Sequence, residues 1–131
     1  MELSNAKIRY LLVIDDLTHS EAARSIDIAV RLGVARSSTH GMLESLADMG
    51  LVHRSPRRSV LLTARGRQLA ACYRGQYRTL CSFFQESAGL SPQEAAESAI
   101  ALLGNLSDGC LEKLCRRTGG QKALSSTFAS P

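Results

Sequence analysis

The segment that most constrains the fold runs from Ser25 to Thr63, with the sequence SIDIAVRLGVARSSTHGMLESLADMGLVHRSPRRSVLLT. The pattern predicts a short apolar helix, a turn at Gly33, a second helix ended by Gly50 and then a basic hairpin. These elements follow one another without a gap. Two helices joined by a tight turn and followed by a hairpin have the order of a winged helix-turn-helix.

Apolar spacing and capping residues define the elements around the turn. Ser25 is the expected N-cap of the first helix of the pair. The second helix of the pair has an expected inward face of Thr39, Leu43, Leu46 and Ala47. In chain order, the sequence predicts helices over 5–17, 26–32 and from about 36 to Gly50, and strands over 51–54 and 59–62, joined by a turn at 55–58.

The C-terminal half is predicted to be helical throughout. Thr63 can cap a long helix from Ala64 to about residue 87, which Gly89 ends. Ser91-Pro92-Gln93-Glu94 predicts a capping box at the start of a helix that runs to about residue 106, and a last helix follows over 108–117. The predicted fold class is mainly α. We expect a winged helix-turn-helix domain over 1–64, a helical dimerisation domain over 65–117 and a disordered tail over 118–131.

Charge is distributed unevenly along the chain. The net charge is +4, but residues 1–80 carry 12 Lys and Arg against 7 Asp and Glu, whereas residues 81–131 carry 4 against 5. Five arginines and no acid fall within 51–67. A basic run beside a helix-turn-helix favours contact with nucleic-acid phosphates over a merely solvated surface. The expected partner is therefore double-stranded DNA.

Composition indicates a soluble cytoplasmic protein with no membrane partner. No apolar run approaches the roughly 20 residues of a membrane span, and the N-terminus lacks a secretory signal pattern. Four cysteines without a C-x-x-C pair suit a reducing compartment, where they are expected to be small buried apolar side chains. No phosphate loop, paired carboxylates or nucleophile–histidine pattern is present, so we predict that the chain is not an enzyme.

The candidate DNA-contacting residues lie at the start of the second helix of the pair and in the hairpin. Helices of this kind direct their N-terminal residues at base edges in the major groove. The candidates are Arg36, Ser37, Ser38, His40, Gly41, Arg54, Arg57 and Arg58.

These residue types suit different contacts with a duplex. Arg36 is the candidate for a guanine contact, because a guanidinium fork matches O6 and N7. Ser37 and Ser38 are expected to hold phosphates, and Gly41 leaves room for close approach to DNA. The sequence also leaves simpler interpretations open. The serines can serve only to start the helix, and Arg36 and His40 can be ordinary exposed side chains.

The stretches DIAVRLGVARSSTHGMLESLADMGLV and VLLTARGRQLA resemble the diphtheria toxin repressor family of iron- and manganese-dependent regulators. A weaker match continues through AGLSPQEAAESAIALLGNLSDGCLEKL, which corresponds to the family's helical dimerisation region. The resemblance covers about residues 5–117. MarR-type winged helices are the nearest confusable family, but the order of wing, LTxxG motif, long helix and short helices fits the metal-dependent regulators better.

The resemblance implies a homodimeric repressor that binds a palindromic operator and is activated by a divalent metal, Mn or Fe. It places the metal ligands at positions where this chain has Tyr77, Cys81, Ile100, Leu103 and Gly104, with the first-helix ligand at Ile8 or Arg9. Mn(II) and Fe(II) prefer carboxylate and imidazole ligands, which this set lacks. We therefore expect a lost metal switch, with the interhelical space filled by packed side chains and no cofactor.

Two alternatives remain open at the level of sequence. A winged-helix regulator could sense a thiol-reactive or small-molecule signal, for example through Cys72 or Cys81. Alternatively, the chain could be a protein-interaction module that no longer binds DNA. The operator sequence, the regulated genes and the direction of regulation are not specified by these patterns.

Overall fold

The computed structural model describes residues 3–19, 22–55 and 59–129, with side chains up to residue 118. The chain divides into two compact units, one of Ala6–Tyr73 and one of Met1–Asn5 with Arg74–Pro131. We call them the winged unit and the helical unit. The division falls inside a long helix at residue 73, whereas the sequence suggested a boundary at residue 64.

The winged unit contains three helices and three short strands. Helix α1 spans Asn5–Leu17, α2 spans Ser25–Leu32 and α3 spans Arg36–Asp48, as the apolar patterns predicted to within about one residue. The predicted N-cap of α2 was wrong. Ser25 is the first helical residue, and Arg24 occupies the cap position without a side-chain hydrogen bond. Gly33 ends α2 with φ 67°, the left-handed conformation that favours glycine.

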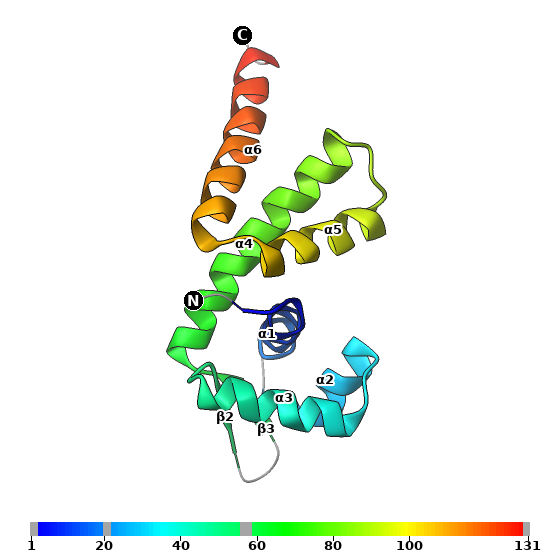
Figure 1. The fold of residues 1–131 in the computed structure, drawn as a ribbon, viewed down its shortest axis with the longest axis vertical. Helices are drawn as coiled ribbons and strands as arrows, with labels where there is room; N and C mark the ends of the chain where they lie inside the picture. The colour runs from blue at the N-terminus through cyan, green and yellow to red at the C-terminus, as the bar shows by residue number, and fades with distance from the viewer. Residues whose placement is uncertain (1–2, 20–21, 56–58, 130–131) are drawn as a thin grey trace. The chain divides into compact units, whose positions relative to one another are not determined.

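Strands β1 (Ala23–Arg24), β2 (Val52–Arg54) and β3 (Ser59–Leu62) form an antiparallel sheet in the order β1-β3-β2. The hairpin β2–β3 was predicted, and its register pairs Val52 with Leu62 and Arg54 with Val60. Strand β1 was not predicted, because two residues are too short to show an alternating pattern. Figure 1 shows the hairpin and α2 on either side of α3, consistent with the contacts that α3 makes with α2 and β2.

The core of the winged unit is aliphatic and holds α3 by one face. Leu43 and Leu46 are completely buried, as predicted, and so is Thr39. The Thr39 hydroxyl donates to the Ala35 carbonyl at 3.2 Å and lies 3.5 Å from the Tyr10 hydroxyl. This buried hydroxyl therefore has hydrogen-bonding partners within the protein. The other fully buried large residues of this unit are Ile8, Leu11, Ile14, Ile28, Leu51 and Val60.

The LTxxG motif joins the hairpin to the following helix, α4 (Ala64–Glu86). The Thr63 hydroxyl accepts the Gly66 N–H at 3.0 Å, which is the predicted helix cap, and donates to the Gly50 carbonyl at 2.7 Å. Gly66 packs on the backbone of Leu51, where a Cβ would overlap the carbonyl oxygen and lie 3.0 Å from the carbonyl carbon. Threonine and glycine are thus each required by local geometry at this junction.

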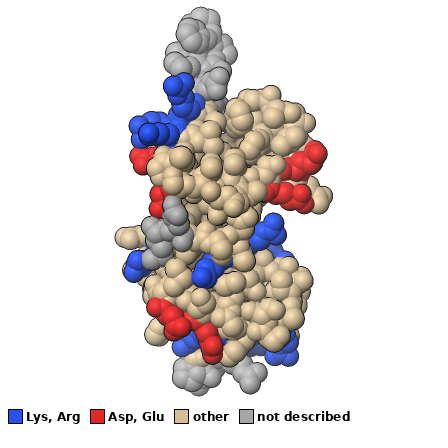
Figure 2. Space-filling view, in the orientation of Figure 1, with Lys and Arg blue, Asp and Glu red and all other residues tan. Residues whose placement is uncertain are grey.

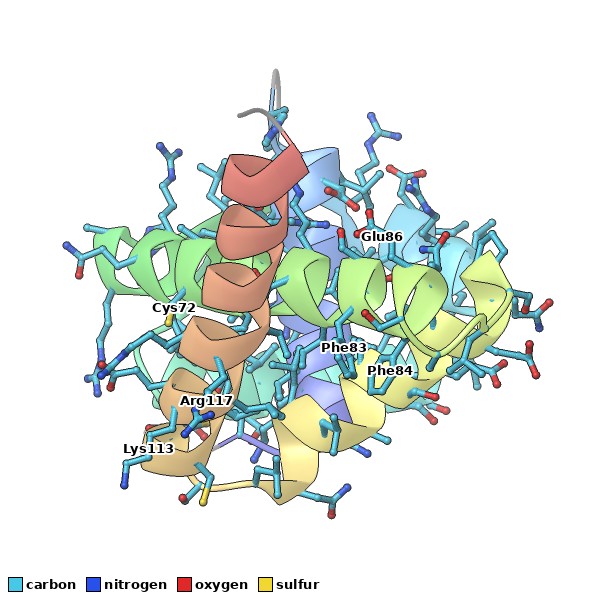
Figure 3. All side chains as sticks on the ribbon, turned by 90° about the horizontal axis from the view of Figure 1, so that it is seen from above. Cys72, Phe83, Phe84, Glu86, Lys113 and Arg117 are labelled. Atoms are coloured by element: carbon cyan, nitrogen blue, oxygen red, sulfur yellow. The ribbon has the colours of Figure 1, made fainter. Side chains whose placement is uncertain are left out.

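The helical unit contains the rest of α4 together with α5 (Pro92–Asn105) and α6 (Asp108–Ala129). The capping box was confirmed: Glu94 N–H donates to the Ser91 hydroxyl at 3.1 Å, and Ser91 N–H donates to the Glu94 carboxylate at 2.9 Å. Phe83 and Phe84, toward the end of α4, meet edge to face with ring centroids 5.6 Å apart (Figure 3).

The predicted disordered tail falls on α6, whose backbone is helical to Ala129. Thr118, the first residue of that tail, is buried, and its hydroxyl donates to the Cys115 carbonyl at 3.2 Å. The side chains beyond it lie outside the described residues. None of the helices in the described ranges combines the length and apolarity needed to cross a bilayer.

Candidate nucleic-acid interface

Helix α3 presents a polar, exposed surface opposite its buried face. All five predicted positions on this helix are exposed, in contrast to Leu43 and Leu46 on the other side. They are Arg36, Ser37, Ser38, His40 and Gly41. A Cβ at Gly41 would meet nothing within 4 Å, so the protein's own packing does not require glycine there.

The N-terminus of α3 has no side-chain cap. Ala35 occupies the N-cap position in extended conformation, and its side chain makes no capping hydrogen bond. Ser37 and Ser38 lie inside the helix, so a role in capping it does not explain them. The N–H groups of an uncapped first turn can donate to an anion, and the helix dipole favours negative charge at this end. The start of α3 is therefore suited to a phosphate.

A chain of side-chain contacts connects α3 to the hairpin. Nη2 of Arg54, on β2, lies 3.1 Å from Nδ1 of His40. Nε2 of the same imidazole lies 3.2 Å from Oε1 of Glu44, one turn further along α3. His40 and Arg54 were predicted from sequence as separate contacts. Glu44 was not predicted, although its i, i+4 spacing from His40 could have indicated it.

The basic residues of the wing are only partly described. Arg54 is half-buried, while Arg65 and Arg67 at the start of α4 are exposed. Arg57 and Arg58 lie outside the described residues, so their predicted role stays a prediction. The face seen in Figure 2 carries Lys and Arg side chains in separate groups, with acidic side chains between them.

The positions that the family resemblance assigns to metal ligands are largely filled by packing. Ile100 and Leu103 on α5 are 8% and 2% exposed. Gly104 packs on Asn5 at the start of α1, where a Cβ would overlap the side-chain amide and lie 2.7 Å from the backbone nitrogen. No apolar side chain or glycine can supply the donors that Mn(II) or Fe(II) needs.

The remaining positions do not complete a ligand set. Tyr77 and Cys81 on α4 are half-buried, Ile8 is completely buried and Arg9 is exposed. Among the residues that the structure describes, no three His, Cys, Asp or Glu side chains are grouped closely enough to hold a metal ion. The donor set present therefore does not fit the metal that the resemblance implies.

The cysteines differ from the expectation of small buried residues. Cys72 and Cys110 are exposed, and that expectation was wrong for both; Cys72 is labelled on α4 in Figure 3. Cys81 and Cys115 are half-buried. Burial raises the pKa of the Cys81 thiol, and a hydrogen bond with Tyr77 lowers that pKa by less. A raised pKa reduces the thiolate fraction, which gives no support to Cys81 as a reactive sensor.

Comparisons with known proteins agree with this architecture. The IclR helix-turn-helix domain family matches residues 9–56. The chain is 36% identical over 104 residues to the transcriptional regulator MntR of Escherichia coli O6:H1, covering 79% of this chain and 66% of that protein. It is 30% identical over 91 residues to an uncharacterised HTH-type transcriptional regulator of Methanocaldococcus jannaschii, covering 70% of this chain and 73% of the relative.

The fold is shared with solved regulators. The structure of a manganese-dependent transcriptional repressor in complex with manganese superposes with a TM-score of 0.73 at 26% identity, over 86% of this chain and 52% of that one. The chain thus spans just under two thirds of the E. coli regulator and about half of this repressor. The relatives are transcriptional regulators rather than enzymes. The chain belongs to the diphtheria toxin repressor and MntR family of helix-turn-helix transcriptional regulators.

Proposed function

We propose that this chain is a sequence-specific DNA-binding transcriptional regulator that represses as a homodimer on a palindromic operator, without a divalent-metal switch. The observation that carries the proposal is the two-sided character of α3. Leu43 and Leu46 anchor one face in the core, and the opposite face is polar, exposed and begins with an uncapped turn. That arrangement is what a helix needs to pack on a domain and enter a groove.

The DNA contact that we propose for each residue follows from the geometry of its hydrogen-bond donors. Arg36, exposed at the first turn, offers a planar fork for the O6 and N7 atoms of guanine. Ser37 and Ser38, with the uncapped N–H groups beside them, hold a phosphate and set the register of the helix on the duplex. The arginines of the wing add sequence-independent contacts to the backbone.

Homodimerisation and the palindromic operator form one linked part of the proposal. A two-fold dimer presents two identical copies of α3, so its operator repeats one half-site in inverted orientation. Its support is the resemblance of residues 88–114 to the family's dimerisation region. Sedimentation of the full chain at micromolar concentration should show a dimer, and a monomer at the concentration that saturates DNA would contradict this part.

Metal independence rests on the misfit between the donor set and the metal. Ile100, Leu103 and Gly104 supply no ligand, and Asn5 fills the space in front of Gly104. We therefore expect MnCl₂, FeSO₄ or ZnCl₂ to leave the thermal melting temperature and the affinity for duplex nearly unchanged from their values in EDTA. A ligand at 100 times its Kd stabilises the folded state by about 2.7 kcal/mol. A metal-dependent gain of that size in stability or in the free energy of duplex binding would refute metal independence.

Selection from a pool of random duplexes tests DNA binding directly. Enrichment of an inverted repeat is expected, and the logarithm of affinity should fall with the logarithm of salt concentration by about 0.9 per phosphate contacted. Arg36→Ala should cost about 1–3 kcal/mol and relax preference at one base of each half-site. Lys113→Ala, which removes an exposed charge on α6 in the helical unit, is the matched control. A salt slope near zero would favour a protein-interaction module instead.

A further inference from the structure

The contacts of His40 determine which of its ring nitrogens carries the proton. A guanidinium can only donate hydrogen bonds, so Nδ1 of His40 must accept from Nη2 of Arg54, at 3.1 Å. The proton of the neutral ring then lies on Nε2, which is 3.2 Å from the Glu44 carboxylate and donates to it. The order of donation is Arg54 to His40 to Glu44. A doubly protonated ring could not accept from Arg54.

Each partner comes from an element of the winged unit whose position is fixed by packing. His40 and Glu44 lie one turn apart on α3, whose other face is anchored by Leu43 and Leu46. Arg54 is at the end of β2, where it pairs with Val60 in the antiparallel ladder. Along this strand Val52 is buried, His53 exposed and Arg54 half-buried, so Arg54 shares the side of Val52 and extends toward α3.

We propose that His40 is a positioning residue that holds Arg54 of the wing against α3 for contact with a DNA phosphate, and does not itself contact a base. The inference rests on the proposed function and refines it. Both ring nitrogens of His40 are engaged by protein groups, which leaves neither for a base edge. Arg54 gives one of its five N–H donors to His40, and the others can still reach phosphate oxygens.

The expected benefit is preorganisation rather than stability. His40 and Glu44 are 61% and 62% exposed, and exposed pairs of this kind contribute little to folding. A long arginine loses rotamer freedom when it binds DNA, and a side chain already held in place loses less. Prior ordering of one such side chain corresponds to a gain of about 2- to 10-fold in affinity. That range sets the size of the effect to look for.

A double-mutant cycle on the selected duplex tests the role of His40. His40→Ala should weaken binding about 2- to 10-fold, and Arg54→Ala should weaken it further and lower the salt slope by about one unit. The double variant should bind no worse than Arg54→Ala alone, because His40 acts through Arg54. His40→Gln, whose amide oxygen can accept from Arg54, should recover most of the loss. Equal melting temperatures exclude an effect through folding.

The outcomes separate this inference from the proposed function. Losses that multiply in the double variant would overturn the inference, because they would mean that His40 contacts DNA independently of Arg54. Nitrogen NMR of the free chain is the second measurement, and a proton on Nδ1 of His40 instead of Nε2 would also overturn it. If the unaltered chain binds no duplex, the proposed function is wrong. The proposed role of His40 in DNA contact is then wrong as well, even if NMR finds its proton on Nε2.

Discussion

The winged unit and the helical unit keep different parts of the family pattern. In the winged unit, residues of the family's LTxxG motif have a structural reason: Thr63 caps α4, and Gly66 approaches the backbone of Leu51. In the helical unit, three of the positions that the resemblance assigns to metal ligands hold Ile100, Leu103 and Gly104, which supply no donor, and the other two hold the half-buried Tyr77 and Cys81. The winged unit thus keeps the motif residues of a helix-turn-helix, whereas the helical unit lacks, at these positions, the donor set that Mn(II) or Fe(II) prefers.

One pair of glycines shows how the same residue serves the two units differently. Gly66 and Gly104 both lie where a Cβ would overlap a neighbour. At Gly66 the neighbour is backbone, the carbonyl of Leu51, whereas at Gly104 the nearest atoms belong to the side chain of Asn5. A backbone held in a helix–sheet junction cannot move aside as a side chain can. The two sites should therefore differ in their tolerance of alanine.

The largest expected effect is that of Gly66→Ala. The added methyl group would force the start of α4 away from Leu51, so we expect the free energy of unfolding to fall by about 3 kcal/mol, measured by urea denaturation. Gly75→Ala is the control on the same helix, because a Cβ there meets nothing within 4 Å, and it should raise stability by up to about 1 kcal/mol. Equal effects of the two variants would refute the close approach at Gly66.

Gly104→Ala should have a smaller effect, about 1–2 kcal/mol of unfolding free energy, because the Asn5 side chain can rotate away. The backbone nitrogen of Asn5, at 2.7 Å from the added Cβ, prevents full relief. Adding Asn5→Ala to Gly104→Ala should therefore restore part of the loss. Gly109→Ala, on α6 with open space, is the control. No loss in Gly104→Ala would mean that Gly104 and Asn5 are not in contact.

The helices and the hairpin were predictable because local signals define them. Glycines in the left-handed conformation, the Thr63 cap and the Ser91 capping box fix most helix ends within a residue or two of the prediction. Strand β1 was not predictable from local sequence, since its two residues form a strand only because β3 is present to pair with them. Helix α6 continues past residue 117, and the sequence there shows no apolar spacing that would have predicted it.

The candidate site was predictable as a list of residues but not as a set of contacts. Exposure of the predicted residues on α3 follows from the apolar spacing on its opposite face. The engagement of His40 by Arg54 depends on the distance between α3 and β2, which no local pattern specifies. The approach of Asn5 to Gly104 is of the same kind, because these residues are far apart in the sequence and meet only in the fold.

Ser91→Ala should lower the free energy of unfolding by about 1 kcal/mol, since it removes the side chain that caps α5. The effect also has a pH dependence. Hydrogen bonds from the Ser91 backbone and side chain lower the pKa of Glu94 below its ordinary value. A lowered folded-state pKa stabilises the fold above the ordinary pKa, and this contribution is lost as pH falls through the folded-state pKa.

Glu94→Gln is the matching variant, because it keeps the shape of the side chain and removes its titration. Its stability should fall less steeply than that of the unaltered chain when the pH is lowered from 5 toward 3. Urea denaturation at several pH values makes the comparison. Parallel curves for the two proteins would show that the capping box does not depend on the charge of Glu94.

The smallest expected effect is chemical and leaves stability unchanged, but it tests whether the helical unit can sense a thiol-reactive signal. Cys72 and Cys110 are exposed, so a maleimide should label them quickly at pH 7.5, as followed by mass spectrometry of proteolytic fragments. Cys81 should react more slowly, because burial both shields the thiol and raises its pKa, which lowers the fraction of thiolate. Unfolding the chain in urea should bring the four cysteines to similar rates. If Cys81 reacted first in the folded chain, the result would favour the alternative of a thiol-sensing regulator. Slow labelling of Cys81 would instead agree with a packing role for this position on α4.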